Sequence, residues 1–224
     1  LTVMQFTKSY YYNNTDALTD KGPPINIVDA WLIWQYLSWR GPIKNYLEIG
    51  VWTGAVYSLV AEQQPECNID LVCPRIYRVE PTMKKLQHKY TRTYAKKSAD
   101  VDWVNIDRSY DIFYAYHPME LTTEIIEPAL PRTSENTLLW LDKHPDTQLA
   151  KVHSMLRERQ WKQWLVTDQL EWWTHKSKTI QPFINYLLHE SNIGWFAYLK
   201  QEQSVWKLSA PQCVYDNPDL FNQM

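Results

Sequence analysis

The sequence predicts an α/β protein with a doubly wound, mostly parallel sheet that ends in an antiparallel hairpin. Short apolar segments of strand length alternate with segments of helical periodicity along most of the chain. A buried strand is predicted at Tyr46–Val51, and it runs directly into a glycine turn and an apolar helix. Three predicted strands carry acidic residues at their ends, Glu48, Asp107 and Asp142. Ligands bind at this edge of such a sheet, beyond the carboxyl ends of its strands.

The N-terminal region is predicted to contain an irregular arm and one helix. Residues 1–25 are polar and include the clusters Tyr10–Tyr12 and Gly22–Pro24, so we expect an arm there. Asn26 is a suitable cap for a helix at Ile27–Trp39. This helix is apolar on most sides, so the sheet and either the arm or a partner chain must cover it.

The elements that follow alternate in regular order. The strands are expected at Tyr46–Val51, Asn68–Cys73, Arg75–Glu80, Val101–Asp107 and Thr137–Asp142. The helices are expected at Ala55–Gln63, Pro81–Lys97, Glu120–Leu130 and Thr147–Gln160. Because helices separate the strands, neighbouring strands are expected to run parallel.

Two segments near the C-terminus can supply the closing hairpin. Trp161–Trp173 has strand character around a turn at Asp168, and Gly194–Leu208 forms a second candidate after a helix at Ile180–His189. The first continues the order of the sheet directly, so the second is expected to be an extension. The expected organisation is an arm (1–25), a domain (26–209, of which 178–209 could be an extension) and an irregular tail (210–224).

Composition narrows the classes of partner. Lys plus Arg is 23 and Asp plus Glu is 25, which argues against nucleic-acid binding by bulk charge. No apolar run is long enough to span a bilayer. Three cysteines without a C-x-x-C pair fit a reducing compartment, so we expect the cytoplasm. The 12 tryptophans and 15 tyrosines favour a homo-oligomer or a subunit of a larger assembly. The tryptophans expected at such an interface are Trp31, Trp34, Trp39, Trp172, Trp173, Trp195 and Trp206.

The glycine turn carries a recognisable motif. Glu48-x-Gly50-x-x-x-Gly54 resembles motif I of the class I S-adenosylmethionine (SAM)-dependent methyltransferases. It differs from the dinucleotide fingerprint because Trp52 stands where the second glycine would be. The resemblance implies a methyltransferase-like Rossmann fold, SAM as the cofactor, and cofactor contacts from Glu48, Gly50, Trp52 and Gly54.

A second segment extends this resemblance. Asp102–Asp111, then Pro128–Leu130, then Thr137–Asp142 resembles a subgroup that includes small-molecule and sugar O-methyltransferases, in which one strand ends Ile-Asp-Gly-Asp-His-Ser-Tyr. The resemblance implies a small-molecule methyl acceptor and a catalytic and cofactor-binding role for Asp107. If a metal is bound, Mg²⁺ is expected between the carboxylates of Asp107 and Asp142. His144 is the histidine placed to act as a general base.

The chain also departs from the subgroup's pattern. Arg108 replaces the Gly-Asp-His of the pattern, and Cys73 falls where an acid would bind the cofactor's ribose. Asp70 on the same strand or Glu80 on the next could replace that acid. Two functions therefore remain open. One is a SAM-dependent enzyme that O-methylates a small molecule or sugar, and the other is a catalytically silent methyltransferase-like module with a structural or interaction role.

Overall fold

A computed structural model describes residues 25–116, 122–143, 149–190 and 197–216. The strands are β1 (Asn45–Ile49), β2 (Asn68–Val72), β3 (Thr91–Tyr94), β4 (Tyr110–Ala115), β5 (Thr133–Asp142), β6 (Trp161–Val166), β7 (Leu170–His175), β8 (Tyr198–Glu202) and β9 (Val205–Ser209). The α-helices are α2 (Ile27–Arg40), α3 (Ala55–Gln63), α4 (Glu80–Leu86), α5 (Thr123–Ile126), α6 (Leu149–Glu158), α7 (Gln181–His189) and α8 (Gln212–Asp216). The 3₁₀ turns are η1 (Ile76–Arg78), η2 (Ser98–Asp100), η3 (Trp103–Asn105) and η4 (Glu127–Arg132).

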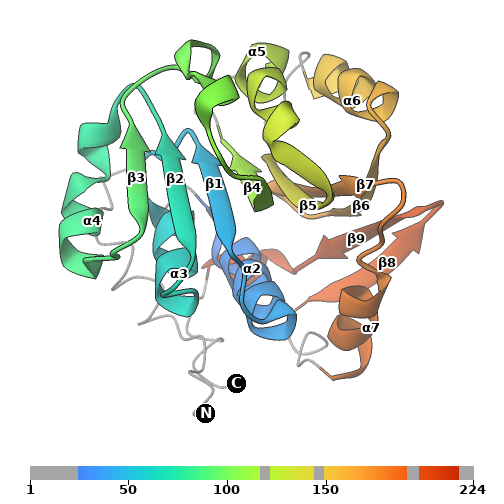
Figure 1. The fold of residues 1–224 in the computed structure, drawn as a ribbon. Coiled ribbons are helices and arrows are strands. Elements are labelled where there is room, and N and C mark those ends of the chain that lie inside the picture. Colours follow the sequence, from blue (N-terminus) through green and yellow to red (C-terminus); the bar gives the residue numbers. More distant parts are fainter. Residues whose placement is uncertain (1–24, 117–121, 144–148, 191–196, 217–224) are drawn as a thin grey trace.

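The described strands form one sheet in the order β3-β2-β1-β4-β5-β7-β6-β9-β8 (Figure 1). The strands from β3 to β5 run parallel, and β7 joins β5 antiparallel. The hairpin β6–β7 closes the main sheet, and the hairpin β8–β9 extends it beyond β6. The predicted fold class is therefore confirmed, and both predicted hairpins exist in the expected order.

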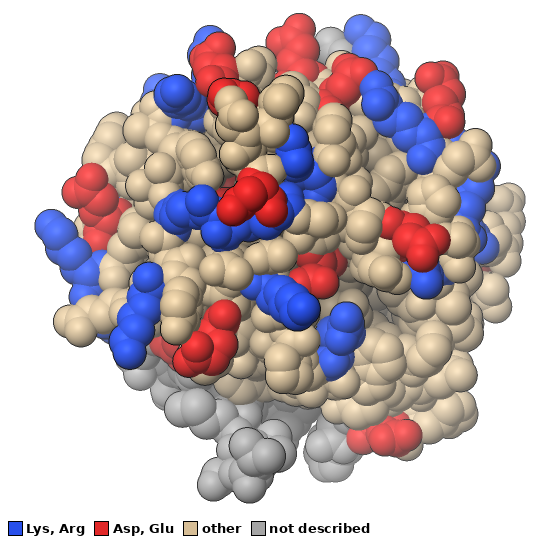
Figure 2. Space-filling model, in the orientation of Figure 1, with Lys and Arg blue, Asp and Glu red and all other residues tan. Residues whose placement is uncertain are grey.

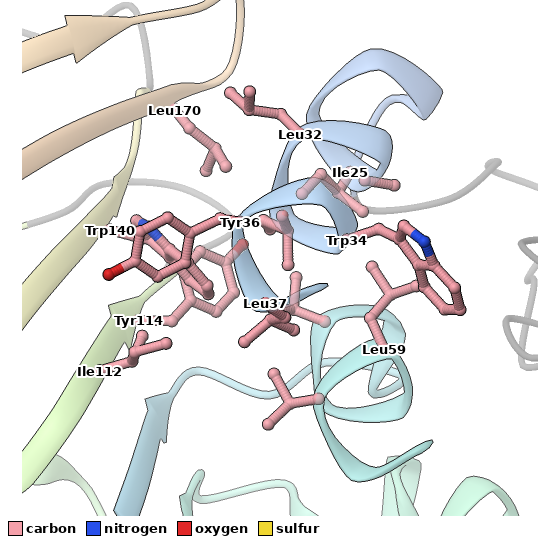
Figure 3. Close-up of a cluster of buried hydrophobic side chains, with 14 of the residues drawn as sticks. Ile25, Leu32, Trp34, Tyr36, Leu37, Leu59, Ile112, Tyr114, Trp140 and Leu170 are labelled. Carbon is pink, nitrogen blue, oxygen red and sulfur yellow. The ribbon is translucent and has the colours of Figure 1, made fainter. Parts of the chain in front are cut away.

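Helices cover both faces of this sheet (Figure 1). One core lies between the sheet and α2, α3 and α7, and the other lies under α5, α6, η3 and η4. Figure 3 shows part of the first core, to which α2 contributes Leu32, beside Leu170 of β7, and Leu37. The alternation along each strand thus sends successive side chains into two different cores.

Helix α2 begins and ends at the signals that the sequence carries. The Asn26 side chain accepts a hydrogen bond from the Asp29 N–H (2.8 Å), and Gly41 follows the helix at φ 75°. Trp31 and Trp34 are buried, at 2% and 5% exposure. Their burial removes the exposed apolar face that motivated the expected interface.

The hairpin tryptophans follow the same pattern. Trp172 and Trp173 are fully buried, and Trp206 is half-buried. Trp195 lies outside the described residues, as do most of the predicted arm and tail. Among the described tryptophans, Trp39 is the exposed one, at 37% exposure. No helix in the described part of the chain is long and apolar enough to cross a membrane.

Three predicted elements are wrong. Arg75–Glu80 forms η1 and the start of α4, not a strand. The predicted helix Pro81–Lys97 ends at Leu86, because Gln87 adopts the left-handed conformation (φ 51°) and the β-branched and aromatic segment Thr91–Tyr94 pairs with β2 as β3.

The predicted strand Val101–Asp107 is the third error. This segment forms η3 with its flanking residues, so its apolar residues follow a spacing of three, not two. Trp103 and Ile106 enter the core, whereas Val104 is 81% exposed. The strand that occupies the place of the fourth is Tyr110–Ala115, which begins after Asp107.

Candidate ligand cavity at the strand ends

A cavity of about 430 Å³ opens at the carboxyl ends of the central strands. It is lined by Ile49, Gly50, Val72, Pro74, Lys96, Lys97, Ser98, Ala99, Tyr116, Thr122, Glu124 and Ile125. These residues follow or end β1, β2, β3 and β4, or belong to the start of α5. Because the strand order reverses between β1 and β4, this is the switch point at which doubly wound sheets bind ligands. Its volume suits a nucleoside-sized molecule.

The glycine turn that borders the cavity is required by the fold itself. Gly50 has φ 82°, and a Cβ there would lie 1.8 Å from the Tyr116 carbonyl oxygen. Gly54 has φ 85° and caps α3, and a Cβ there would lie 2.5 Å from Val79 Cγ2. Both positions therefore exclude other residues before any ligand is considered. Gly50 lines the cavity, whereas Gly54 ends the turn at the start of α3 and is not among the described lining residues.

Trp52 and Glu48 are not among the described residues of the cavity wall. Trp52 adopts a left-handed backbone (φ 50°), and the Arg78 guanidinium lies 4.3 Å from its ring centroid. Glu48 is 1% exposed and accepts a hydrogen bond from the Tyr46 hydroxyl at 2.7 Å. Burial raises the pKa of Glu48 to about 8, although the Tyr46 hydrogen bond opposes the shift.

Asp70, in the middle of β2, is the buried member of an ionic cluster with Arg92 and Arg108. Its carboxylate accepts hydrogen bonds from the Tyr110 hydroxyl (2.6 Å) and Arg92 Nε (3.2 Å), and Arg108 Nη1 lies 3.6 Å away. Burial raises the pKa of Asp70, and Tyr110 and Arg92 oppose that shift. The Asp70 carboxylate is therefore already paired within the fold, and Asp70 is not among the described residues of the cavity wall. Glu80, the other candidate, begins α4 and is exposed.

The metal prediction fails on geometry. Asp107 lies before β4, is 82% exposed and pairs with Arg92 (3.6 Å), whereas Asp142 ends β5. Since β4 and β5 are parallel, the two carboxylates lie at opposite ends of the sheet, on the order of 20 Å apart. Among the described residues no group of three or more His, Cys, Asp or Glu could hold a metal ion. Asp107 is also not among the described residues of the cavity wall, so its cofactor contact and catalytic role stay predictions.

Asp142 nevertheless has unusual chemistry. It is 5% exposed, and its pKa is raised to about 8, first by burial and then by the nearby Asp29 carboxylate. A hydrogen bond from Tyr114 opposes the shift. Asp29, at the start of α2, is itself fully buried with a pKa raised to about 6 by burial. His144, the predicted base, lies outside the described residues.

Most residues of the cavity wall escaped prediction. Lys96 and Lys97 end a predicted helix, and Ser98 follows it. Tyr116 follows β4, which begins after the predicted fourth strand ends. A signal was present, because the segment Tyr110–Ala115 is a clear apolar and aromatic run. Correct placement of that strand would have brought Tyr116 and Thr122 to the cavity.

Neither a family model nor a curated protein matches this chain. Solved structures do resemble it. A Staphylococcus aureus protein provisionally named as a caffeoyl-CoA O-methyltransferase is 13% identical, with a TM-score of 0.61 over 75% of this chain and 93% of that one. Podospora anserina methyltransferase PaMTH1, bound to S-adenosylhomocysteine, is 13% identical with a TM-score of 0.58 over 75% and 86%. TomG, an O-methyltransferase of tomaymycin synthesis from Streptomyces achromogenes solved with SAM, is 14% identical with a TM-score of 0.56 over 77% and 91%.

At these identities the likeness concerns the fold. The chain has the α/β fold of the class I methyltransferases, with a mostly parallel sheet and a terminal antiparallel hairpin.

Proposed function

We propose that the protein is a SAM-dependent methyltransferase that methylates a hydroxyl of a small molecule or sugar. The observation that carries the proposal is the position of the cavity, beside the glycine turn and at the switch point of the sheet. The methyltransferase-like fold supports this choice, and two structures of that fold carry SAM or its demethylated product. The charge distribution agrees with a small-molecule acceptor, since Figure 2 shows acidic and basic side chains interspersed on the face in view.

The residues of the wall fit the adenosine part of this cofactor. Ile49, Val72 and Ile125 offer apolar surface to a flat base, and Glu124 offers a carboxylate to a ribose hydroxyl. When bound, SAM supplies an electrophilic methyl group. The chain's own task is then to position the acceptor, exclude water and take up one proton.

Asp142 is the residue that we assign to proton uptake. It ends β5 on the same edge of the sheet as the cavity, and its pKa of about 8 suits a group that exchanges protons near neutral pH. His144, two residues further along the chain, is the second candidate for this base. A metal ion has no part in this proposal.

The binding step is tested by calorimetric titration of the full chain with SAM. We expect saturable binding by the unmodified protein, and binding weakened about tenfold or more by Ala99→Trp, which fills the cavity from its exposed wall. Ala150→Trp is the matched control, because Ala150 is an exposed alanine on α6 outside the cavity wall. A folded protein that binds no SAM at millimolar concentration would eliminate the enzyme.

The alternative is a catalytically silent methyltransferase-like module with a structural or interaction role. A specific observation favours it: of the predicted cofactor residues, Gly50 is the one found among the described residues of the wall. Large exposed side chains such as Trp39 and Tyr198 offer contact surface for a second copy or a larger assembly. Sedimentation of a stable monomer at high micromolar concentration, together with SAM binding, would reject this alternative.

A further inference from the structure

The end of the cavity that follows β3 is basic. Lys96 and Lys97 are consecutive and both line the cavity, and Glu124 is the acid among the described lining residues. The described wall of this cavity of about 430 Å³ therefore includes two lysines and one acidic residue. Lysine is a point charge with three donors and suits phosphate oxygens. Such a wall favours a ligand with negative charge.

The end of β2 supplies no opposing charge. Cys73 and Pro74 follow β2, and neither is an acidic residue. The acid nearest in sequence, Asp70, is held by Tyr110 and Arg92 away from the cavity wall. A carboxylate from β2 is thus absent from the described wall, and the neighbouring positive charge is not neutralised from that side.

Ser98 gives an independent indication of a ligand. It lines the same part of the cavity and is 6% exposed, and its hydroxyl has no hydrogen-bond partner among the described residues. Buried hydroxyl groups are usually satisfied, so an unpaired one beside a cavity calls for an explanation. Rotation about its χ1 angle would let it donate to an oxygen of a bound anion.

We propose that this cavity binds a phosphorylated nucleoside, with the phosphate held by Lys96, Lys97 and Ser98 and the base against Ile49, Val72 and Ile125. This ligand overlaps the place proposed for the adenosine of SAM, so it competes with the cofactor. The lysines favour the phosphate, because AMP is an anion whereas SAM carries a net positive charge. Only the competition depends on the proposed function, and the binding itself does not.

The test compares three probes by calorimetry on the full chain: adenosine 5′-monophosphate (AMP), adenosine and inorganic phosphate. We expect AMP to bind about tenfold more tightly than adenosine, and inorganic phosphate to bind much more weakly than AMP. Lys96→Met/Lys97→Met should remove the preference for AMP. Lys84→Met/Lys89→Met is the matched control, because these exposed lysines lie close in sequence but not on the cavity wall.

Ser98→Ala separates a ligand contact from a structural role. We expect about threefold weaker AMP binding with an unchanged or higher Tm, because the hydroxyl has no hydrogen-bond partner among the described residues of the free protein. Equal affinity for AMP and adenosine, unchanged AMP binding in Lys96→Met/Lys97→Met, or phosphate that binds as tightly as AMP would each overturn the proposal. AMP binding that persists while SAM fails to bind would reject the methyltransferase and keep the nucleotide site.

Discussion

At the scale of single residues, three buried carboxyl groups set the chemistry of the α2 side of the sheet. Asp29, Glu48 and Asp142 are 0%, 1% and 5% exposed, and burial raises the pKa of each. The pKa of Tyr114 is raised well above its usual range, chiefly by burial, and the charges of all three carboxylates raise it further. Each of the three acids therefore stays protonated to a higher pH than an ordinary carboxyl group.

This arrangement predicts a stability that falls as pH rises. A carboxyl whose folded pKa is raised stabilises the protein fully below its unfolded pKa, and the contribution is lost as pH rises toward the folded value. For Glu48 the window runs from 4.5 to about 8 and is worth a few kcal/mol. We expect Glu48→Gln to flatten the decrease in unfolding free energy between pH 5 and pH 9, roughly. Urea denaturation across this pH range measures the unfolding free energy.

The control for this prediction is Glu190→Gln, which changes an exposed glutamate. Asp29 and Asp142 remain in both variants, so some loss of stability at high pH should persist. An unfolding free energy whose pH dependence is the same in Glu48→Gln and the unmodified protein would contradict the assignment.

The Asp70 cluster illustrates a carboxylate with a structural task. Tyr110→Phe removes the hydroxyl that donates to Asp70 at 2.6 Å and leaves a buried carboxylate oxygen without that donor. We expect a loss of about 1–3 kcal/mol in unfolding free energy, with unchanged affinity for cavity ligands. Tyr90→Phe, at an exposed tyrosine, should cost far less. Weaker ligand binding in Tyr110→Phe at unchanged stability would restore a ligand role for Asp70.

At the scale of elements, the turn after β1 is determined by the neighbouring strand. Tyr116 donates its N–H to the Ile49 carbonyl (2.9 Å), and its own carbonyl lies where a Cβ of residue 50 would be. We expect Gly50→Ala to cost on the order of 3 kcal/mol or more. Gly41→Ala is the control, because Gly41 has a similar φ (75°) but nothing within 4 Å of its Cβ position. Its cost should be about 1 kcal/mol.

Thermal unfolding of the two glycine variants checks this prediction. Similar Tm values for both would show that the steric contact with Tyr116 relaxes easily. If the prediction holds, a substitution at Gly50 is a poor test of cofactor binding, because it damages the turn whether or not a ligand is present. Ala99→Trp avoids this difficulty.

The elements also show which features the sequence determines. The cap at Asn26, the strand before Gly50 and the hairpin around Asp168 are local signals, and each could be predicted. The third strand could not, because the short β3 gains its strand conformation from pairing with β2. The fourth strand has a signal at Tyr110–Ala115, but the apolar residues of η3, at a spacing of three, resemble a strand earlier in the chain. The candidate site was the least predictable part, because the residues that line a cavity at strand ends depend on where each strand ends.

At the scale of the whole molecule, the question is whether the β8–β9 hairpin is a separate unit. One continuous core contains residues of α2, β1 and β4 together with Phe183, Ala197 and Leu208. The Trp206 indole N–H donates to the Gln181 side chain (3.3 Å), and β9 pairs directly with β6. These contacts tie the extension to the main domain, so residues 26–209 should unfold as one cooperative unit.

Leu208→Ala tests this unity. Leu208 is 2% exposed, so its truncation should reduce the unfolding free energy by about 2–4 kcal/mol. If the extension unfolds with the domain, fluorescence of the buried tryptophans and far-UV circular dichroism should shift together to lower urea concentration, in a single transition. Val205→Ala, at a half-buried position of the same strand, should shift both signals much less. Two separate transitions in Leu208→Ala would instead make the hairpin an independent appendage, and the cavity at the β1–β4 switch point would then keep its ligand affinity after the first transition.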